Sequence, residues 1–133
     1  MGHEFAGEVV EVGADAKALW KPGDRVCAMP AIGCGKCRAC LSGDVVLCTS
    51  MRGTGLGQVP GAYAEYVLAG SAETLRLPAG VSYREGALVE PLAVGLHAVN
   101  AAKLESGARV MVIGAGPIGL AVTAWARFFG ARC

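Results

Sequence analysis

The sequence predicts a mixed fold, in which a β-rich region is followed by an α/β region. Up to residue 78, short apolar segments alternate with glycine and proline turns, a pattern typical of a β-barrel or sandwich. Between residues 79 and 92 the apolar pattern becomes helical. The chain then has the order strand, glycine-rich turn, helix, which indicates the start of an α/β domain.

The strands of the β-rich region are predicted from their composition and from the turns between them. Lys21-Pro22-Gly23-Asp24 has the chemistry of a turn, because proline fixes φ at one corner and glycine accepts the next. Residues 51–61 are rich in glycine and are expected to form a loop. The predicted strands are residues 5–12, 25–29, 63–68 and 75–77.

Helices are predicted from residue 82 onward. Ser82 and Glu85 form the spacing of a capping box, so a short helix is expected to begin there. Pro91 is expected to end or kink that helix, because proline lacks an N–H and disfavours helical geometry at the residue before it. A second helix is predicted from Leu92, with apolar residues repeating at i, i+4 and i+7.

The end of the chain carries one more strand and one more helix. Residues 106–107 break the second helix, and residues 109–113 are predicted to form a buried strand. Residues 117–129 are predicted to form a helix that Gly130 closes.

The composition excludes several classes of protein. The chain has 133 residues, 53% of them hydrophobic, which is enough for a packed core. Its net charge of +1, with both signs interspersed, gives no basic surface for nucleic acid or for an anionic membrane. Residues 110–126 carry no charge, but three glycines and a proline interrupt them, so no membrane span is expected.

A cluster of cysteines is the strongest chemical signal. Two-residue gaps let neighbouring thiolates face one ion, and Gly35 permits the tight turn that this needs. Four thiolates leave zinc no open position, so this zinc is predicted to hold structure and not to react. The spacing is C-x2-C-x2-C-x7-C, at Cys34, Cys37, Cys40 and Cys48.

Two other uses of these cysteines are weighed against zinc. A disulfide scaffold would suit a small secreted protein, but no signal peptide precedes the cluster and the chain is rich in core residues. An iron–sulfur cluster shares the first spacings, but the ferredoxin pattern ends with a cysteine after three residues and then a proline. Neither feature occurs here.

The segment Gly114-Ala115-Gly116-Pro117-Ile118-Gly119 is a G-x-G-x-x-G sequence between a predicted strand and a predicted helix. In that context it is typical of a dinucleotide-binding loop, although a plain strand–helix turn is the alternative. The acidic residue that would choose between NAD and NADP is expected beyond Cys133. The predicted cofactor-binding residues are Gly114, Gly116, Pro117, Ile118 and Gly119.

Six stretches together resemble one family. They are residues 2–10 (GHEFAGEVV), 22–26 (PGDRV), the four cysteines, 64–67 (AEYV), 90–93 (EPLA) and 114–119 (GAGPIG). In this order they resemble the zinc-dependent medium-chain alcohol dehydrogenases. The resemblance implies a partial GroES-like β-barrel catalytic domain in residues 1–85, followed by the start of a Rossmann dinucleotide-binding domain in residues 86–133.

The resemblance also implies a second, catalytic zinc. His3 would be its ligand and Glu4 an outer or alternate ligand. Glu90 falls where the sorbitol, threonine and butanediol dehydrogenase branch has glutamate. Without the family, His3 would more simply be a packed or exposed residue and Glu90 a helix-end carboxylate. The implied reaction is hydride transfer between an alcohol or polyol and NAD or NADP, with zinc polarising the substrate oxygen.

The resemblance makes this chain a fragment, because the family's upstream cysteine and proton-relay residue are not in it. The 133 residues alone are expected to bind one zinc and not to turn over. The parent enzyme is expected to be a cytoplasmic homodimer or homotetramer that acts on a small alcohol, polyol or ketone and binds neither nucleic acid nor membrane. The alternatives are a non-enzymatic zinc-binding or iron–sulfur electron-transfer module and a relative with a degenerate substrate site.

Overall fold

A three-stranded antiparallel sheet organises the first part of the chain in the computed structural model, which describes residues 1–133. Its strands are β1 (Ala6–Glu8), β2 (Arg25–Ala28) and β5 (Thr74–Arg76), in the order β1-β2-β5. Residues 26–28 of β2 are buried, as expected for the apolar middle strand of a sheet. The predicted strands at 25–29 and 75–77 are therefore confirmed.

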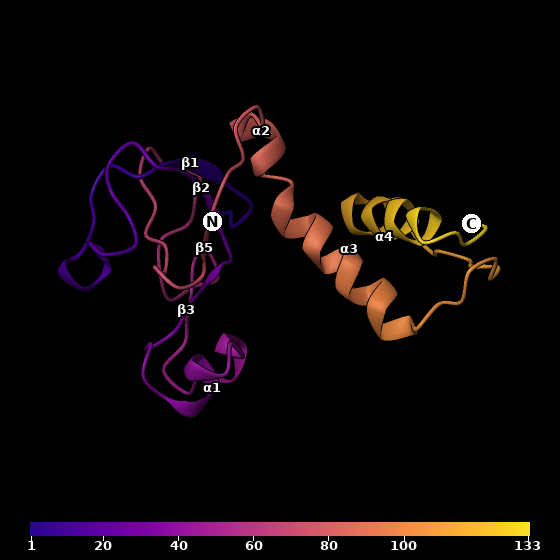
Figure 1. The fold of residues 1–133 in the computed structure, drawn as a ribbon, viewed down its shortest axis with the longest axis horizontal. Helices are drawn as coiled ribbons and strands as arrows, with labels where there is room; N and C mark the ends of the chain where they lie inside the picture. Colours follow the sequence, from indigo (N-terminus) through magenta and orange to yellow (C-terminus); the bar gives the residue numbers. More distant parts are fainter. The chain divides into compact units, whose positions relative to one another are not determined.

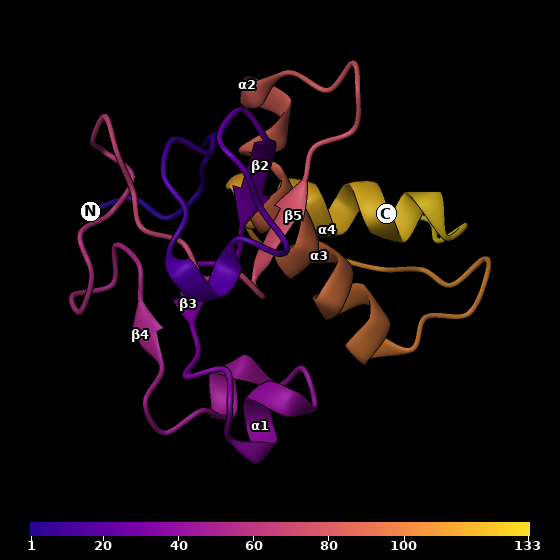
Figure 2. The ribbon, with the colours of Figure 1, turned by 60° about the vertical axis from the view of Figure 1, so that its left-hand side comes forward.

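A second, two-stranded sheet forms the base of the cysteine lobe, the name used here for residues 34–48. Its strands are β3 (Ala31–Ile32) and β4 (Arg52–Gly53), so β4 lies inside a segment predicted as loop. Between them the chain forms α1 (Arg38–Leu41) and the 3-10 helix η2 (Val45–Leu47). Figure 2 shows the lobe as an excursion beyond β3 and β4.

The predicted capping box is confirmed at α2 (Tyr83–Gly86). The backbone N–H of Glu85 donates to Ser82 Oγ at 3.2 Å, and the N–H of Ser82 donates to Glu85 Oε2 at 2.8 Å. The Ser82 hydroxyl, which donates to Glu85 Oε2 at 2.7 Å, and the Ser82 N–H together hold the pKa of the Glu85 carboxyl below its usual value. Another 3-10 helix, η1 (Ala14–Ala16), follows β1.

The chain divides into two units, Met1–Ala87 and Leu88–Cys133. Each unit has its own elements (Figure 1), with all the strands in the first and two longer helices in the second. That residues 1–85 and 86–133 are two functional domains stays a prediction.

Helix α3 (Val89–Ala102) corrects the predicted role of Pro91. This proline neither ends α2, which stops at Gly86, nor breaks α3, since it is the third residue of α3. In the first turn of a helix the N–H that proline lacks has no helical partner, so proline is tolerated there. Lys103, with a left-handed φ of 49°, ends α3 before the predicted break at residues 106–107.

Helix α4 (Pro117–Phe128) is confirmed to within one residue, and Gly130 follows with φ 88°. It packs closely on α3, because a Cβ added to Gly95 would lie 2.7 Å from Ala121 Cβ. Val99, Ala126 and Ala131 form the buried core of this unit. None of the helices is long and apolar enough to cross a bilayer.

Two predicted strands are wrong. Residues 63–68 and 109–113 do not form strands, and Tyr63 and Ile113 are 86% and 88% exposed. Residues 5–12 form a strand only over Ala6–Glu8. A strand is defined by hydrogen bonds to a neighbour, so apolar, β-branched composition alone does not make one. Pairing at 109–113 is limited to an isolated parallel bridge between Arg109 and Arg132.

The contact between Asp24 and Arg76 makes stability depend on pH. Asp24 accepts hydrogen bonds from Arg76 and from the Lys21 N–H, which hold the pKa of its carboxyl below the usual 3.8. The resulting stabilisation is present above the unfolded-state pKa and is lost as pH falls through the lower folded-state pKa. We therefore expect Asp24→Asn to lower the urea midpoint at pH 7 and to have a smaller effect below about pH 3.8. An equal effect at both pH values would contradict this account.

Candidate metal and cofactor sites

The four cysteine side chains of the lobe converge on one point. Their Sγ atoms all lie within 4.8 Å of one another, and none of them forms a disulfide. The Sγ of Cys40 lies 3.6 Å from that of Cys37 and 4.0 Å from that of Cys34. A zinc ion 2.3 Å from each of four sulfurs at tetrahedral angles holds them about 3.8 Å apart. The cluster therefore has the dimensions of a four-thiolate zinc site.

Local structure brings these thiols together. Cys37 is the N-cap of α1, and its Sγ accepts a hydrogen bond of 3.5 Å from the N–H of Cys40. Cys48 follows η2, with its N–H bonded to the carbonyl of Val45 at 3.0 Å. Val45 and Cys48 are 6% and 5% exposed, so the apolar part of the lobe is small. The caps and turns set the positions of the sulfurs, and few apolar contacts support them.

Protonation in the cluster is uneven. Backbone N–H groups of Lys36 and Cys37 lower the pKa of the Cys34 thiol to about 6. Burial raises the pKa of the Cys40 thiol to about 11. The first thiol is thus ready to bind a cation at neutral pH, while Cys40 gives up its proton when a cation offsets the cost of burying its charge.

His3 and Glu4 lie at the start of the first unit, where the two residues that follow the 51–61 loop hold the backbone before them. The N–H groups of residues 62 and 63 donate to the carbonyls of Gly2 and Met1, at 2.9 and 3.1 Å. His3 is half-buried and Glu4 is exposed. The direction of the chain entering His3 is therefore set by these two bonds.

Two glycines of the 51–61 loop allow this close contact. A Cβ added to Gly55 would lie 2.1 Å from the carbonyl oxygen of Gly2, and one added to Gly61 would lie 2.3 Å from that of Met1. No side chain fits at those distances. Sequence reasoning assigned this loop no role, and its glycine content was the signal that could have indicated a close backbone contact.

Glu90 belongs to the second unit, where it is half-buried in the first turn of α3. The three predicted ligands of the catalytic zinc thus come from two units, His3 and Glu4 from one and Glu90 from the other. Their common metal site remains a prediction.

The glycine loop has the turn, the open backbone and the close helix contact expected of a G-x-G-x-x-G sequence. Gly114 makes the turn with φ 105°, and a Cβ on Gly116 would meet nothing within 4 Å, so the backbone is open there. A Cβ on Gly119 would lie 2.0 Å from the carbonyl oxygen of Gly114, so only glycine lets loop and helix pack this closely. Pro117 opens α4, and the exposed Ile118 follows it. The N-terminus of α4 is a favourable place for a phosphate.

The segments before and after α4 in the sequence, residues 108–110 and Arg132, are hydrogen-bonded to each other. The N–H of Val110 donates to the carbonyl of Arg132 at 2.9 Å, and the N–H of Arg132 donates to the carbonyl of Ala108 at 2.8 Å. The two extended segments that flank the helix are therefore hydrogen-bonded to each other in parallel. This is the connection expected of a strand–helix–strand unit.

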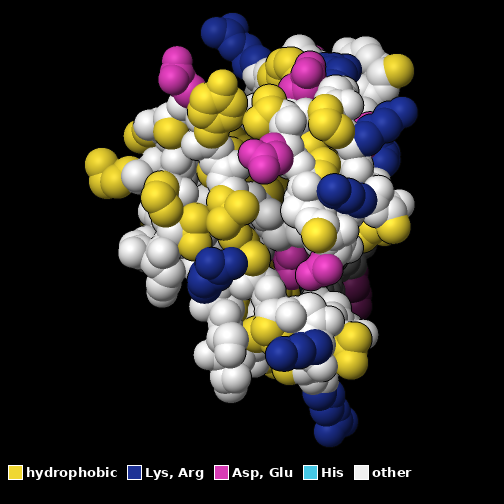
Figure 3. Space-filling model, turned by 90° about the vertical axis from the view of Figure 1, so that its left-hand side faces the viewer, with side chains coloured by type: hydrophobic (Ala, Val, Ile, Leu, Met, Phe, Trp, Pro, Cys, Tyr) yellow, Lys and Arg dark blue, Asp and Glu magenta, His cyan; other side chains and the backbone are white.

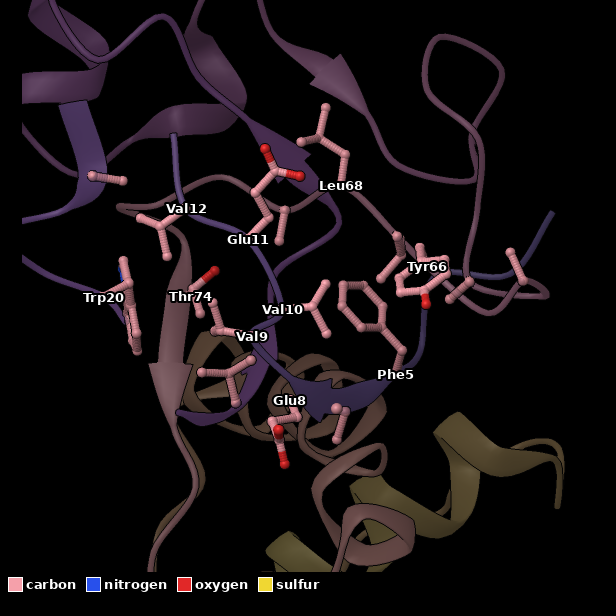
Figure 4. A pocket seen from close by; sticks show the side chains of 18 of the residues that line it. Phe5, Glu8, Val9, Val10, Glu11, Val12, Trp20, Tyr66, Leu68 and Thr74 are labelled. Atoms are coloured by element: carbon pink, nitrogen blue, oxygen red, sulfur yellow. The ribbon is translucent and has the colours of Figure 1, made fainter. Parts of the chain in front are cut away.

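An apolar cavity in the first unit contains none of the predicted site residues. It has a volume of about 320 Å³, and Phe5, Val10, Tyr66 and Leu68 are among the side chains that line it (Figure 4). Hydrophobic side chains also spread over one face of the molecule (Figure 3). Of the residues that line the cavity, Val10, Tyr66 and Leu68 are more than half exposed. The chemistry-bearing residues thus lie outside the cavity.

Comparison with known proteins identifies the family. Residues 1–79 match the alcohol dehydrogenase GroES-like domain. The chain is 39% identical over 131 residues to sorbitol dehydrogenase of Bacillus subtilis (strain 168), covering 98% of this chain and 37% of that protein. It is 42% identical to L-idonate 5-dehydrogenase of Vitis vinifera, covering 98% of this chain and 36% of that protein.

A solved structure agrees with these relatives. A putative zinc-binding dehydrogenase from Sinorhizobium meliloti 1021, bound to NADP, matches with a TM-score of 0.84 and 39% identity, over 98% of this chain and 38% of that one. The chain is a member of the zinc-dependent medium-chain alcohol dehydrogenase family and carries its GroES-like domain. It spans a little over a third of the length of these relatives.

The comparisons also bear on the other predictions. The predicted cofactors, zinc and NAD or NADP, agree with the family and with the NADP-bound neighbour. The alternative of a non-enzymatic zinc or iron–sulfur module is not favoured, because the relatives are polyol dehydrogenases. The GroES-like part of the fold prediction is confirmed.

Removing one thiol tests the cysteine lobe. We expect Cys37→Ser to lose most of the zinc that the chain binds and to lower its melting temperature, since a structural zinc contributes about 10–16 kcal/mol of apparent binding energy in peptide systems. The measurements are elemental analysis and a thermal melt with and without a chelator. The control is Cys133→Ser, because Cys133 is exposed and lies outside the lobe. Full zinc content in Cys37→Ser would rule out the four-thiolate site.

Proposed function

We propose that the chain works as part of a zinc-dependent oxidoreductase that transfers hydride between a secondary alcohol or polyol and NAD or NADP. The observation that carries the proposal is the order of two features along one chain. A GroES-like domain with a four-thiol cluster comes first, and a G-x-G-x-x-G loop that opens a helix follows. Similarity to polyol dehydrogenases over 98% of the chain supports the same function.

The proposed catalytic zinc site consists of His3, Glu4 and Glu90. Imidazole and carboxylate donors are ligands that catalytic zinc uses, and three protein ligands leave a position for substrate. A zinc ion held there would act as a Lewis acid toward the oxygen of an alcohol or carbonyl group. The cluster of four thiols has no such open position, so it is the structural site.

His3 depends on the loop contact described above. The glycines at 55 and 61 let the backbone of residues 1 and 2 lie against the loop, and this fixes the start of the segment that carries His3 and Glu4. A ligand whose backbone is fixed loses less conformational entropy when it binds a metal. The glycine-rich loop therefore supports the proposed catalytic site.

The second unit would hold the dinucleotide. The open backbone at Gly116 and the free N–H groups at the start of α4 suit the pyrophosphate. The Rossmann domain that would begin here is a proposal, which the parallel pairing of residues 108–110 with Arg132 supports. Residues before residue 1 or after Cys133 in a longer protein would complete the substrate pocket and choose between NAD and NADP.

The substrate is proposed from the named relatives, which act on sorbitol and L-idonate. We expect the full-length enzyme to reduce NAD or NADP with such polyols at least about tenfold more efficiently than with ethanol.

Glu90→Gln is expected to lower kcat/KM by at least about 100-fold, because an amide is a weaker ligand than a carboxylate. A matched control is Glu105→Gln, an exposed position after α3. Unchanged activity in Glu90→Gln would contradict the proposed ligand set.

A side chain at Gly116 should interfere with the dinucleotide. The structure leaves open space there and φ is −76°, so Gly116→Val fits the fold but would occupy the place of the pyrophosphate. We expect at least about tenfold weaker NAD(P) binding, measured by fluorescence titration of the full-length enzyme. The control is Gly13→Val, at the N-cap of η1, where a Cβ also meets nothing within 4 Å. Equal affinity in the two variants would argue against this binding site.

The other expectations stay predictions. They are a homodimeric or homotetrameric state, a cytoplasmic location, the absence of nucleic-acid and membrane partners, and a lack of turnover by these 133 residues alone.

A further inference from the structure

Glu73 links the base of the cysteine lobe to the three-stranded sheet. It directly precedes β5, and its carbonyl accepts a hydrogen bond of 2.9 Å from the N–H of Met29, the residue after β2. Its side chain reaches Gly33, whose N–H donates a hydrogen bond of 3.2 Å to Oε1. Gly33 directly precedes Cys34, the first thiol of the lobe.

The backbone at Gly33 lies where the sheet and the cysteine cluster meet. A Cβ added there would be 2.7 Å from Cys40 Sγ and 2.7 Å from a methyl carbon of Val45. The same Cβ would be 3.0 Å from Glu73 Oε1. A side chain at Gly33 would therefore collide with a thiol of the cluster and crowd the Glu73 carboxylate at the same time.

A second glycine makes room for the other oxygen of this carboxylate. Gly70 is buried, and a Cβ added to it would lie 2.0 Å from Glu73 Oε2. The carboxylate of Glu73 is thus confined between two glycines, Gly33 on the side of Oε1 and Gly70 on the side of Oε2. This confinement fixes the direction of the acceptor that Gly33 uses.

We infer that Glu73 is a positioning residue for the structural metal site, which sets the place of Cys34 through the Gly33 N–H without itself binding the metal. The inference rests on the zinc proposed for the cysteine lobe. Metal sites commonly depend on such hydrogen bonds behind their ligands, which orient the donors and raise metal affinity. Here the hydrogen bond from Gly33 to Glu73 holds the backbone next to Cys34. It therefore acts on the direction in which the chain enters the cysteine lobe.

The hydrogen bond and the negative charge of Glu73 predict opposite effects, which makes the inference testable. A carboxylate near four thiolates is unfavourable by its charge, while its oxygen is favourable as the acceptor for Gly33. Glutamine keeps the acceptor oxygen and removes the charge. Alanine removes both.

The experiment measures zinc loss from the zinc-loaded full chain to a colorimetric chelator. We expect Glu73→Ala to release zinc about tenfold faster than the unchanged chain, and Glu73→Gln to stay within about twofold of it. Gly70→Ala keeps Glu73 but displaces its carboxylate, so it should behave like Glu73→Ala. If Glu73→Ala does not fold, Gly70→Ala tests the inference in its place. The control is Glu105→Ala, an exposed glutamate of the second unit.

Cobalt spectra separate positioning of the ligands from general loss of stability. When Co²⁺ replaces zinc, the thiolate-to-cobalt absorption bands report the geometry of the sulfurs. We expect these bands to shift in Glu73→Ala and in Gly70→Ala and to be unchanged in Glu73→Gln and Glu105→Ala. Bands that stay the same in all four variants would overturn the positioning role.

The outcomes distinguish this inference from the proposal on which it rests. If the unchanged chain binds zinc but Glu73→Ala releases it at the same rate, the inference on Glu73 fails and the zinc site stands. If Glu73→Gln is as fast as Glu73→Ala, the hydrogen bond is not the cause and the inference also fails. If the unchanged chain holds no zinc at all, the zinc proposed for the lobe fails first.

Discussion

The convergence of four thiols is the constraint on which the first unit depends. The lobe of residues 34–48 buries only Val45 and Cys48, so apolar packing alone stabilises it weakly. Its α1 and η2 are single turns, too short to be stable on their own. A zinc ion held by the four thiols would supply the missing energy and would join the lobe at four points. The lobe in turn is bounded by β3 and β4, whose pairing closes it on the side of the sheet.

Features encoded by a few neighbouring residues could be predicted from the sequence. The capping box at Ser82, the thiol cluster and the loop that opens α4 each depend on side-chain chemistry at fixed short spacings. Features that depend on a distant partner could not. Residues 63–68 and 109–113 have strand composition, but whether they pair is decided by segments far away in the sequence. The effect of Pro91 depends on where a helix begins, which the residues around it do not determine.

The glycines show the same distinction. Gly114 and Gly119 were assigned roles from a motif, and the structure gives them the expected turn and close contact. Gly55 and Gly61 have equally close contacts, with the carbonyls of residues 2 and 1, which lie far away in the sequence. No local pattern indicates those partners. In a chain with 20 glycines, composition indicates that close backbone contacts exist, but only the fold shows which residues they serve.

The residues proposed to stabilise the cysteine lobe are different from those proposed to take part in the reaction. A four-thiolate zinc site would be closed to substrate, so the proposed roles leave the cysteine cluster outside the reaction. The groups proposed for chemistry are His3, whose preceding backbone lies against a glycine-rich loop, and the open backbone at Gly116. Both are held by backbone contacts and not by a packed core of their own. A side chain at Gly55 or Gly61 would therefore displace the backbone before His3, although neither glycine is a proposed ligand.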